Sequence, residues 1–429
     1  MKWSTVFCET GRMKGLLAGM VMGLMWVLGV GSHPAEAVER RKDQFPTESS
    51  YLIFPLPFSV PGIGEGVFMP INLNNLGGTT ADAYFVGVFG DFSGTYISME
   101  EVPLFTRHIW LKAETARVRG LSFNAYPTRG MDSDGKDGTT IVFSEFVYQG
   151  GEIKLQSAQR QLEYSAQIAN EIATVDKVLD LEGNLLYKVT PRQKNETARI
   201  VHTLRMDNTD DYQDPRAGLR LISSYTNVPA ETLDDPDFFT VTTSAQAYLP
   251  LGKNSTLAIN FMRSDAHVRR KGLTDLATIK ATDGIDCTIA PDPVVCAVDE
   301  DAQARNTQNA NAHGSSLPLG GLNYMRAYPE GRFKGAHTGY FSLEFRINFT
   351  EGFTPFDYWV WKDVKTGLQL ALFYEVGSVS ELSGDLWKQK REDYGAGFRM
   401  VAASGVVYRA DLAVGDEGAA PTIMVMYPW

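Results

Sequence analysis

The chain has 429 residues, 44% of them hydrophobic, and a formal net charge of −11. This length can bury a large core, and the acidic balance argues against nucleic acid as a partner. Beyond residue 30 no run of about 18 consecutive apolar residues occurs, which excludes a protein that crosses a membrane with helices. The 40 glycines and the aromatic content of 11% instead suit many short strands and turns.

The first residues are typical of an export signal. Basic residues precede an apolar run over 16–30, and the small residues Ala35 and Ala37 fit a cleavage site. We therefore expect residues 1–37 to be a signal peptide and the mature chain to begin at Val38. The alternative is a retained membrane anchor, for which the apolar run is short.

A short polar lead over 38–50 follows, in which no folded domain fits. The next run, YLIFPLPFSV over 51–60, is apolar but contains Pro55 and Pro57. Because two prolines spaced in this way lack N–H groups toward the same neighbour, a first strand here would have one poorly hydrogen-bonded seam. The alternative is a segment outside the sheet, tucked inside the fold.

Strand-like runs separated by polar connections make up the next part of the chain. In one of them, Arg199, Thr203 and Arg205 share one face and apolar residues share the other, as expected of a half-buried strand. Strands are predicted at 65–73, 81–90, 93–104, 106–116, 139–149, 152–165, 196–206, 216–227, 237–249 and 254–264. Short turns are predicted at Gly150-Gly151, 207–218 and 251–254, and long connections at 117–138, 166–195, 228–236 and 265–322. Within 166–195, Gly183-Asn184 indicates a small hairpin that projects outward.

Two cysteines remain after the signal, Cys287 and Cys296, and they lie in a polar, Asp-rich segment. In an oxidising compartment they predict a disulfide that closes a small surface loop, worth about 2–3 kcal/mol through the entropy of the unfolded chain. A metal site would need more ligands, and neither a second cysteine pair nor an H-x3-H follows. We therefore expect no metal site.

The region 341–349 alternates without a break. Its apolar residues point one way, and Ser342, Glu344, Arg346 and Asn348 point the other. A soluble sandwich would bury these charges or expose large apolar groups, whereas the wall of a transmembrane barrel has lipid on one side and water on the other. The alternation recurs over 368–377, 394–400 and 406–412. Counting 51–60 as the first strand, the sequence predicts an all-β fold, a transmembrane antiparallel β-barrel of about sixteen strands.

The chain ends in PTIMVMYPW, a last strand with Ile423, Val425, Tyr427 and Trp429 on one face. Aromatic side chains at the last and third-last positions are expected to sit at the membrane interface. The aromatic residues crowded into 353–361 are consistent with the same girdle.

Three pieces of the sequence resemble the BamA/TamA superfamily of outer-membrane assembly barrels, also known as the bacterial surface antigen family. Met325-Arg326-Ala327-Tyr328 is similar to the loop motif V-R-G-F/Y, Glu344 to an acid on the following strand, and Phe373-Tyr374-Glu375-Val376-Gly377 to F-x-D-x-G. The turn 205–218 and the aromatic last strand also resemble features of the family. The resemblance spans essentially the whole mature chain and implies an extracellular loop that folds into the lumen, with its arginine facing both acids.

The expected lock consists of Arg326, Ala327 and Tyr328 on the loop and of Glu344, Glu375 and Gly377 on the wall. Glu344 and Glu375 would repel each other on consecutive strands unless a cation lay between them, and Arg326 is close enough in sequence to be that cation. Two residues depart from the family pattern. Ala327 replaces a glycine and reduces backbone freedom, and Glu375 replaces an aspartate but keeps the charge. The alternative is a solvated Arg326 and two acids that only line a channel.

The resemblance implies a bacterial outer-membrane protein with a signal peptide (1–37), a short periplasmic lead (38–50) and a barrel (51–429), without POTRA domains of its own. Its function would be the insertion or translocation of polypeptide, or of lipid, through a seam between the first and last strands, where Pro55, Pro57, Tyr427 and Trp429 lie. The expected partners are outer-membrane lipid, a polypeptide client and a periplasmic capture protein. The sequence contains no catalytic constellation, so we expect neither an enzyme nor a cofactor. A passive pore, or a structural or adhesive surface protein that acts through its long loops, stays open as an alternative.

Overall fold

The computed structural model describes residues 39–429 except 54, 351–353, 359–360, 403–406 and 426–428. The side chains of 52, 190–193, 354–358, 361–366 and 402 are also left undescribed. The expected signal peptide, Tyr427 and the aromatic cluster over 353–361 therefore lie outside the described part of the chain.

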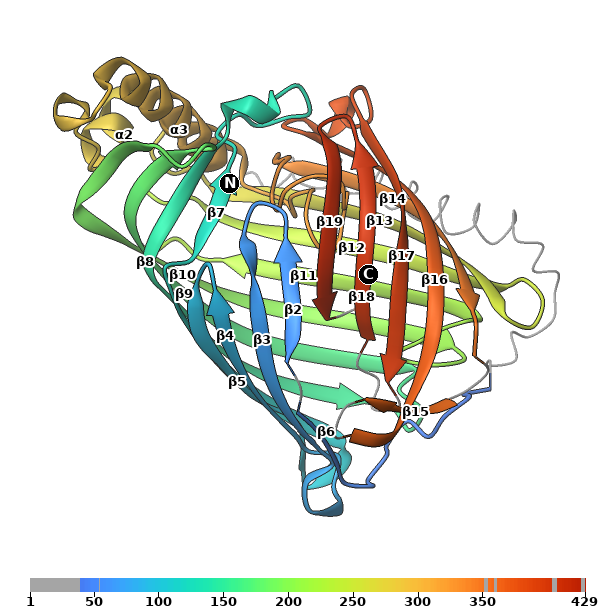
Figure 1. Cartoon of the computed structure of the whole chain (residues 1–429). Coiled ribbons are helices and arrows are strands. Elements are labelled where there is room, and N and C mark those ends of the chain that lie inside the picture. The colour runs from blue at the N-terminus through green and yellow to red at the C-terminus, as the bar shows by residue number, and fades with distance from the viewer. Residues whose placement is uncertain (1–38, 54, 351–353, 359–360, 403–406, 426–428) are drawn as a thin grey trace, which may run out of the picture. The chain divides into compact units, whose positions relative to one another are not determined.

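Residues Arg40–Trp429 form a closed antiparallel barrel of sixteen strands, as predicted (Figure 1). The first wall strand is split into β1 (Ser50–Ile53) and β2 (Leu56–Val60), both of which pair with β3. The other wall strands are β3 (Gly64–Asn74), β4 (Asp82–Gly90), β5 (Ser93–Leu104), β6 (Thr106–Arg119), β8 (Thr139–Gln156), β9 (Leu162–Asp180), β10 (Leu185–Thr209), β11 (Gly218–Val228), β12 (Asp237–Pro250), β13 (Ser255–Arg270), β14 (His337–Asn348), β16 (Trp361–Ser380), β17 (Arg391–Ala402), β18 (Val407–Gly415) and β19 (Gly418–Val425).

Short elements extend this wall. The strands β7 (Ser122–Ala125) and β15 (Thr354–Tyr358) pair with β8 and β16 beyond the ends of β6 and β14. The helices are η1 (Leu76–Gly78), η2 (Gly135–Asp137), α2 (Leu276–Thr282), η3 (Cys287–Ile289), α3 (Pro293–His313) and η4 (Ser383–Asp385). None of the helices in the described residues is both long enough and apolar enough to cross a bilayer.

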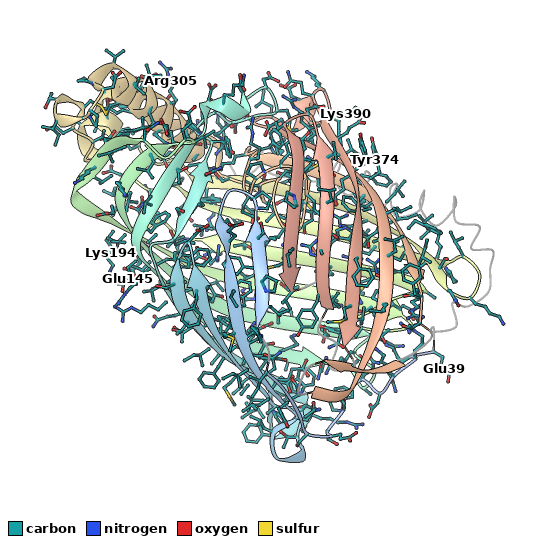
Figure 2. All side chains as sticks on the ribbon, in the orientation of Figure 1. Glu39, Glu145, Lys194, Arg305, Tyr374 and Lys390 are labelled. Atoms are coloured by element: carbon teal, nitrogen blue, oxygen red, sulfur yellow. A yellow bond between two sulfur atoms is a disulfide. The ribbon has the colours of Figure 1, made fainter. Side chains whose placement is uncertain are left out.

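The alternation of the sequence sets the inside and the outside of the wall. On β14, Ser342, Glu344 and Arg346 are buried in the lumen, between apolar neighbours that face outward. On β16, Leu372 and Tyr374 are exposed on the outer face (Figure 2). This period of two is what a wall between lipid and a polar lumen requires.

The two rims of the barrel differ in the length of their connections. The loop rim carries the long connections 120–138, 229–236, 271–336 and 381–390, and it lies at the top of Figure 1 beside the helices. The terminus rim carries the described ends of the chain and the turns 75–81, 157–161, 210–217 and 251–254. An antiparallel barrel with an even number of strands places both of its ends on the same rim.

Two predicted boundaries are wrong. Gly150-Gly151 is not a turn, because β8 continues through both glycines, and a Cβ at Gly151 would meet nothing within 4 Å. The expected connection 166–195 is not a loop, because β9 and β10 form one long hairpin that turns at 181–184, near the predicted Gly183-Asn184. The predicted strand 152–165 spans the end of β8 and the start of β9, so the total of sixteen still holds. The strands of this hairpin are rich in polar residues and therefore lack the alternation of apolar and polar residues that predicts a strand.

A helical insert that the sequence did not predict occupies 276–313 of the connection between β13 and β14. Cys287 and Cys296 form the predicted disulfide within it. Cys296 packs with Val178, Tyr187 and Val189 of the β9–β10 hairpin in one apolar cluster. The insert is therefore docked on that hairpin at the loop rim.

Asp299 of α3 makes this contact depend on pH. The Tyr187 hydroxyl donates to Asp299 Oδ2 at 2.6 Å. Burial raises the pKa of Asp299 above its ordinary value, against the lowering effect of that hydrogen bond. Because the pKa is raised in the docked form, docking is strongest below about pH 4 and weakens as the pH rises toward the raised pKa.

We expect Asp299→Asn to keep the hydrogen bond from Tyr187 while removing the cost of burying a charge. At neutral pH, hydrogen exchange of α3 amides should slow by roughly three- to tenfold relative to wild type, and this gain should vanish near pH 4. The control is Asp301→Asn, which removes the same charge from an acid that pairs with Lys280 and Arg305 instead. Equal slowing in both variants would contradict the assignment to Asp299.

Candidate functional site

Residues 314–336 follow the helical insert and fold into the lumen. The two arms of this loop bridge at Leu319 and Phe333, which exchange backbone hydrogen bonds of 2.9 Å. Both side chains are fully buried. Met325 has a positive φ of 60°, which turns the chain so that Arg326 lies at the tip of the loop.

Arg326 reaches three carboxylates on the barrel wall. Its Nη2, Nε and Nη1 atoms lie 3.3, 3.0 and 3.0 Å from oxygens of Glu344, Glu375 and Asp411. The Arg326 backbone N–H donates to the other Glu375 oxygen at 2.8 Å. The guanidinium carbon lies 3.4 Å from the centroid of the Phe373 ring. The structure thus brings together the predicted arginine and both predicted acids, and it adds Asp411.

These groups belong to a larger charge cluster, which is buried throughout. Glu344 also accepts from Arg346 and Arg399, at 2.6 and 2.5 Å, and the backbone N–H of Ala327 donates to Asp393 at 3.3 Å. The members are Arg326, Arg346, Arg399, Arg409, Glu344, Glu375, Asp393 and Asp411. Acidic and basic side chains are equal in number, and a buried site needs this balance because an uncompensated charge costs about 3–5 kcal/mol.

Ala327 fits the lumen without backbone strain. The positive φ of this part of the loop falls on Met325 and not on Ala327. A Cβ at Gly415 would lie only 3.0 Å from that of Ala327, so the wall supplies the missing space. Gly377 does the same for the other side of the loop, since a Cβ there would lie 2.5 Å from Leu319 Cδ1. Glycines on the wall therefore allow the close approach of the loop.

Tyr328 anchors the loop beside the tip. Its hydroxyl donates to the Glu392 carbonyl at 3.1 Å and accepts the N–H of Asp416 at 3.3 Å. Its ring packs against Phe333 with centroids 5.0 Å apart. The loop is thus fixed to the last strands of the barrel by backbone contacts as well as by charge.

The barrel closes where β2 meets β19, and among the described residues this seam has fewer residue pairs than any other junction between wall strands. A single residue pair, Ser59 with Ile423, joins the two strands within the described residues. By contrast, β18 and β19 pair continuously from Tyr408–Val425 to Gly415–Gly418. The first and last strands are therefore adjacent but barely hydrogen-bonded.

Prolines explain why the pairing between β2 and β19 does not extend along the two strands. Pro57 lies two residues from Ser59, so its missing N–H would point to the same side of β2. In the register set by the one pair, Pro61 would face Pro421 of β19. Pro55 lies in the break between β1 and β2. The sequence drew attention to Pro55 and Pro57, but Pro61 and Pro421 were missed because the facing strand was not yet known.

The loop bridges this seam from the lumen. On the β19 side, Arg332 Nη2 lies 2.7 Å from Glu417 Oε1. On the β2 side, the N–H of Glu330 donates to the Pro61 carbonyl at 3.3 Å. One loop therefore contacts both turns that flank the seam. Arg332 was missed from the sequence because its partner Glu417 lies 85 residues away.

Trp429 does not sit at the membrane interface, and this prediction is wrong. Its ring lies 6.4 Å from that of Tyr248, a buried lumen residue, and the Arg346 guanidinium lies 5.4 Å from its centroid. Trp429 therefore lies in the lumen. Contact with Arg346 favours this position, since a cation is attracted to the face of an indole ring.

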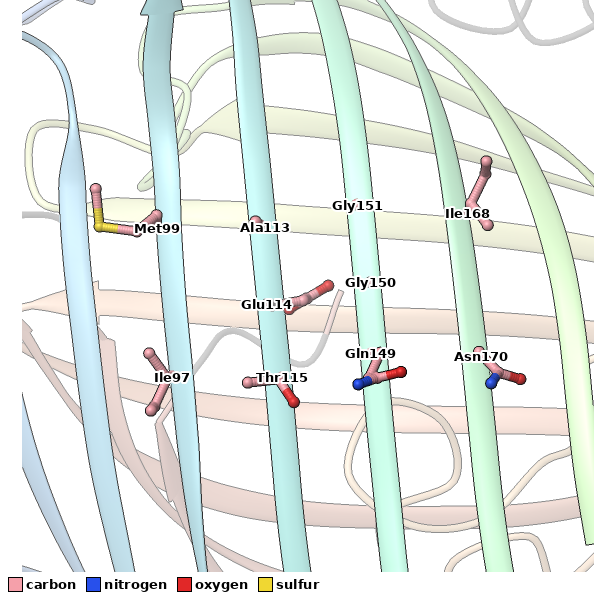
Figure 3. Close-up of a pocket in the computed structure, with 10 residues that line it drawn as sticks. All are labelled: Ile97, Met99, Ala113, Glu114, Thr115, Gln149, Gly150, Gly151, Ile168 and Asn170. Carbon is pink, nitrogen blue, oxygen red and sulfur yellow. The ribbon is translucent and has the colours of Figure 1, made fainter.

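A hollow of about 510 Å³ lies elsewhere, on the outer wall across β5, β6, β8 and β9 (Figure 3). It forms because Ala113 and Gly151 leave a gap between the larger Met99 and Ile168. Its lining is mostly apolar, so it suits an acyl chain better than a polar ligand. In the part of the chain that the structure describes, no group of three or more His, Cys, Asp or Glu side chains could hold a metal ion.

Removing Arg326 should leave Glu375 with fewer compensating charges than Glu344. Glu344 keeps Arg346 and Arg399 in Arg326→Ala, whereas Glu375 loses its only ion-pair partner among the described residues. We expect Arg326→Ala to destabilise the docked loop by about 3–5 kcal/mol. Arg326→Ala/Glu375→Gln should recover much of that loss, as measured by thermal unfolding in micelles.

The control for this comparison is Arg305→Ala, an exposed arginine on α3, which should not change the unfolding temperature. If the double variant were as unstable as the sum of the two single variants, Arg326 and Glu375 would not be energetically coupled.

No protein-family model and no curated protein matches this chain. Among solved structures it is similar to BamA from Haemophilus ducreyi lacking POTRA domains 1–3, with 11% identity, a TM-score of 0.49 and coverage of 88% of this chain and 69% of that one.

Two CdiB barrels are also similar. The CdiB of Acinetobacter baumannii has 10% identity and a TM-score of 0.45, with 87% of this chain and 58% of that chain covered. The CdiB of Escherichia coli has 10% identity and a TM-score of 0.47, with 88% and 66% covered. This chain thus spans less than two thirds of either CdiB chain. The likeness to these structures is one of fold, an antiparallel β-barrel.

Proposed function

We propose that this barrel works in the bacterial outer membrane and inserts or translocates polypeptide, with the β2–β19 seam as a lateral exit and the loop 314–336 as a stopper. The loop rim is then extracellular and the terminus rim periplasmic. An unfolded polypeptide is the client, a periplasmic capture protein delivers it, and outer-membrane lipid surrounds the wall. The proposal assigns no catalytic role. The observation that carries it is the seam, which has one residue pair among the described residues and is flanked by prolines.

The backbone hydrogen bonding of the β2–β19 seam supports its role as a lateral exit. In a bilayer, each unsatisfied backbone N–H or C=O costs several kcal/mol, so an open strand edge is normally avoided. A proline has no N–H to leave unsatisfied. Pro57 and Pro421 therefore lower the cost of the open edge and also prevent its closure. An edge of this kind can accept the backbone of another strand where donors and acceptors remain.

The contacts of the loop 314–336 support its role as a stopper. It occupies the lumen beside β14 and β16–β18, and it also contacts the turns on both sides of the seam. Release of Arg326 from its acids would therefore free the lumen and loosen the seam together. A client that entered the lumen could bring about this release by competing for Glu344, Glu375 or Asp411.

Restoring the missing donors should close the exit. We expect Pro57→Val/Pro421→Val to extend the β2–β19 pairing and to slow insertion. The assay adds a urea-unfolded, eight-stranded barrel precursor to liposomes that contain the purified protein, and it scores protease protection. The variant should lose about tenfold in rate, toward that of protein-free liposomes, because each added backbone hydrogen bond contributes roughly 1 kcal/mol to closure.

The matched control is Pro103→Val/Pro250→Val, which changes two strand prolines away from the seam. It should insert the precursor at the wild-type rate. If the wild-type protein does not exceed protein-free liposomes, or if the seam variant inserts as well as wild type, the proposed function is refuted.

One observation favours a passive pore as the second candidate. Lys112 on β6 and Glu152 on β8 occupy lumen-facing positions and remain partly exposed, so the stopper does not fill this side of the lumen. Such a lumen could pass small solutes without any lateral opening.

Conductance in planar bilayers separates the two candidates. If the loop is a stopper, Arg326→Ala should raise the single-channel conductance several-fold over the wild-type protein, because the loop loses its buried anchor. Arg305→Ala should leave the conductance unchanged. A wild-type protein that is already fully open, and that Arg326→Ala does not alter, would favour the passive pore.

A further inference from the structure

The lead that precedes the first strand is extended, and it follows the inside of the terminus rim. Going along the chain, Arg41 pairs with Asp210 in the turn 210–217, and Phe45 packs near the turn between β5 and β6. Ser49 then reaches the turn 75–81, where its hydroxyl donates to the Asn75 carbonyl at 2.6 Å. The lead then continues directly into β1.

Arg40 makes the most extensive contact of the lead. Its guanidinium donates to the Gln159 carbonyl at 3.0 Å, to the Thr209 carbonyl at 3.0 Å and to Asp207 Oδ1 at 3.2 Å. The Gln159 carbonyl belongs to the turn 157–161, whereas Asp207 and Thr209 lie at the end of β10. The Arg40 side chain is only 6% exposed. A planar guanidinium with five donors suits such a junction, which a lysine could not satisfy.

The remaining basic residues face an acidic turn. Arg41 Nε lies 2.7 Å from Asp210 Oδ2, and Lys42 Nζ lies 3.2 Å from Asp211 Oδ2. The side-chain oxygens of Asp210 and Asp211 also accept backbone N–H groups of their own turn. The acidic side chains therefore shape the turn and hold the lead at the same time.

Phe45 is an apolar anchor farther along. Its ring is buried, 5.9 Å from the Trp110 ring and 6.1 Å from the His108 ring. The Arg160 guanidinium lies 5.2 Å from its centroid and 4.3 Å from that of Trp110. Burial of an apolar ring stabilises a contact without any charge, so the anchor does not depend on charge alone.

The strand that follows needs such anchoring. β1 pairs only with β3, from Ser50–Asn74 to Ile53–Ile71, and no pairing of β1 with β19 occurs among the described residues. β1 ends at Ile53, and β2 begins at Leu56. Among the described residues, the four pairs with β3 are the strand pairing that connects β1 to the wall.

We propose that residues 40–49 are a strap that fastens the first strand of the barrel to three turns of the terminus rim and to the start of β6, and thereby holds β1 in place at the seam. The strap joins β1 to the wall from β3 to β11. Movement at the seam is consequently left to β19 and the strands next to it. This inference concerns the mechanics of the barrel and holds for any client.

The test is hydrogen exchange of the purified barrel in lipid nanodiscs. In the wild-type protein, amides 40–45 should exchange slowly. In Arg40→Ala/Arg41→Ala, these amides and those of β1 should exchange about tenfold or more faster, while β16 keeps its wild-type rate. The control is Arg305→Ala/Lys388→Ala, which removes two exposed cations from the loop rim. It should change neither segment.

A second design avoids a folding defect. A site-specific protease sequence replaces the exposed residues 46–48, and the folded barrel is then cut. Cutting leaves the contacts of residues 40–45 in place but disconnects these residues from β1, so exchange in β1 should again rise about tenfold. Unchanged β1 exchange after cutting, or free exchange of amides 40–45 in the wild type, would overturn the proposal. Neither result depends on the insertion assay, so the strap and the proposed function can fail separately.

Discussion

The balance of charge around Arg326 is the constraint on which the rest of the site depends. Four arginines and four acids are buried in one part of the lumen, where the loss of water makes each uncompensated charge cost several kcal/mol. Arg326 is the only one of the four arginines that comes from the loop. The wall is therefore not neutral without the loop, and the position of the loop follows from the charges of the wall.

This dependence links the stopper to the seam. The loop that completes the charge balance also contacts the turns beside β2 and β19, and those strands share one residue pair among the described residues. A seam so short contributes little closure by itself, since a backbone hydrogen bond stabilises by about 1 kcal/mol. Contacts other than the backbone hydrogen bonds between β2 and β19 must therefore keep the barrel closed. The loop does so at the loop rim, and the strap holds the first strand at the terminus rim.

The sequence predicted the barrel, the disulfide and two of the three acids that pair with Arg326, because each depends on a local pattern or on a motif that resembles a known family. Alternation showed which charges of β14 and β16 face the lumen. It failed over 166–195, where polar strands extend past the apolar belt and lack the two-residue period. It also could not locate Trp429 or the partners of Arg40, because these contacts join residues far apart in sequence. Such contacts depend on how the sixteen strands are staggered.

The prolines of the seam show how one residue type can serve two needs. A strand edge in lipid is costly because its N–H groups lack acceptors, and natural barrels normally avoid that cost by pairing every edge. Replacing an N–H by a proline nitrogen removes the unsatisfied group and the possibility of pairing in the same step. The barrel can therefore keep a weak junction in its wall without the full penalty of an exposed edge. The junction still needs mechanical support, because neither of its strands is held there by the other. The buried loop and the basic lead supply that support from opposite rims, so opening the barrel would require moving β19 against a fixed first strand.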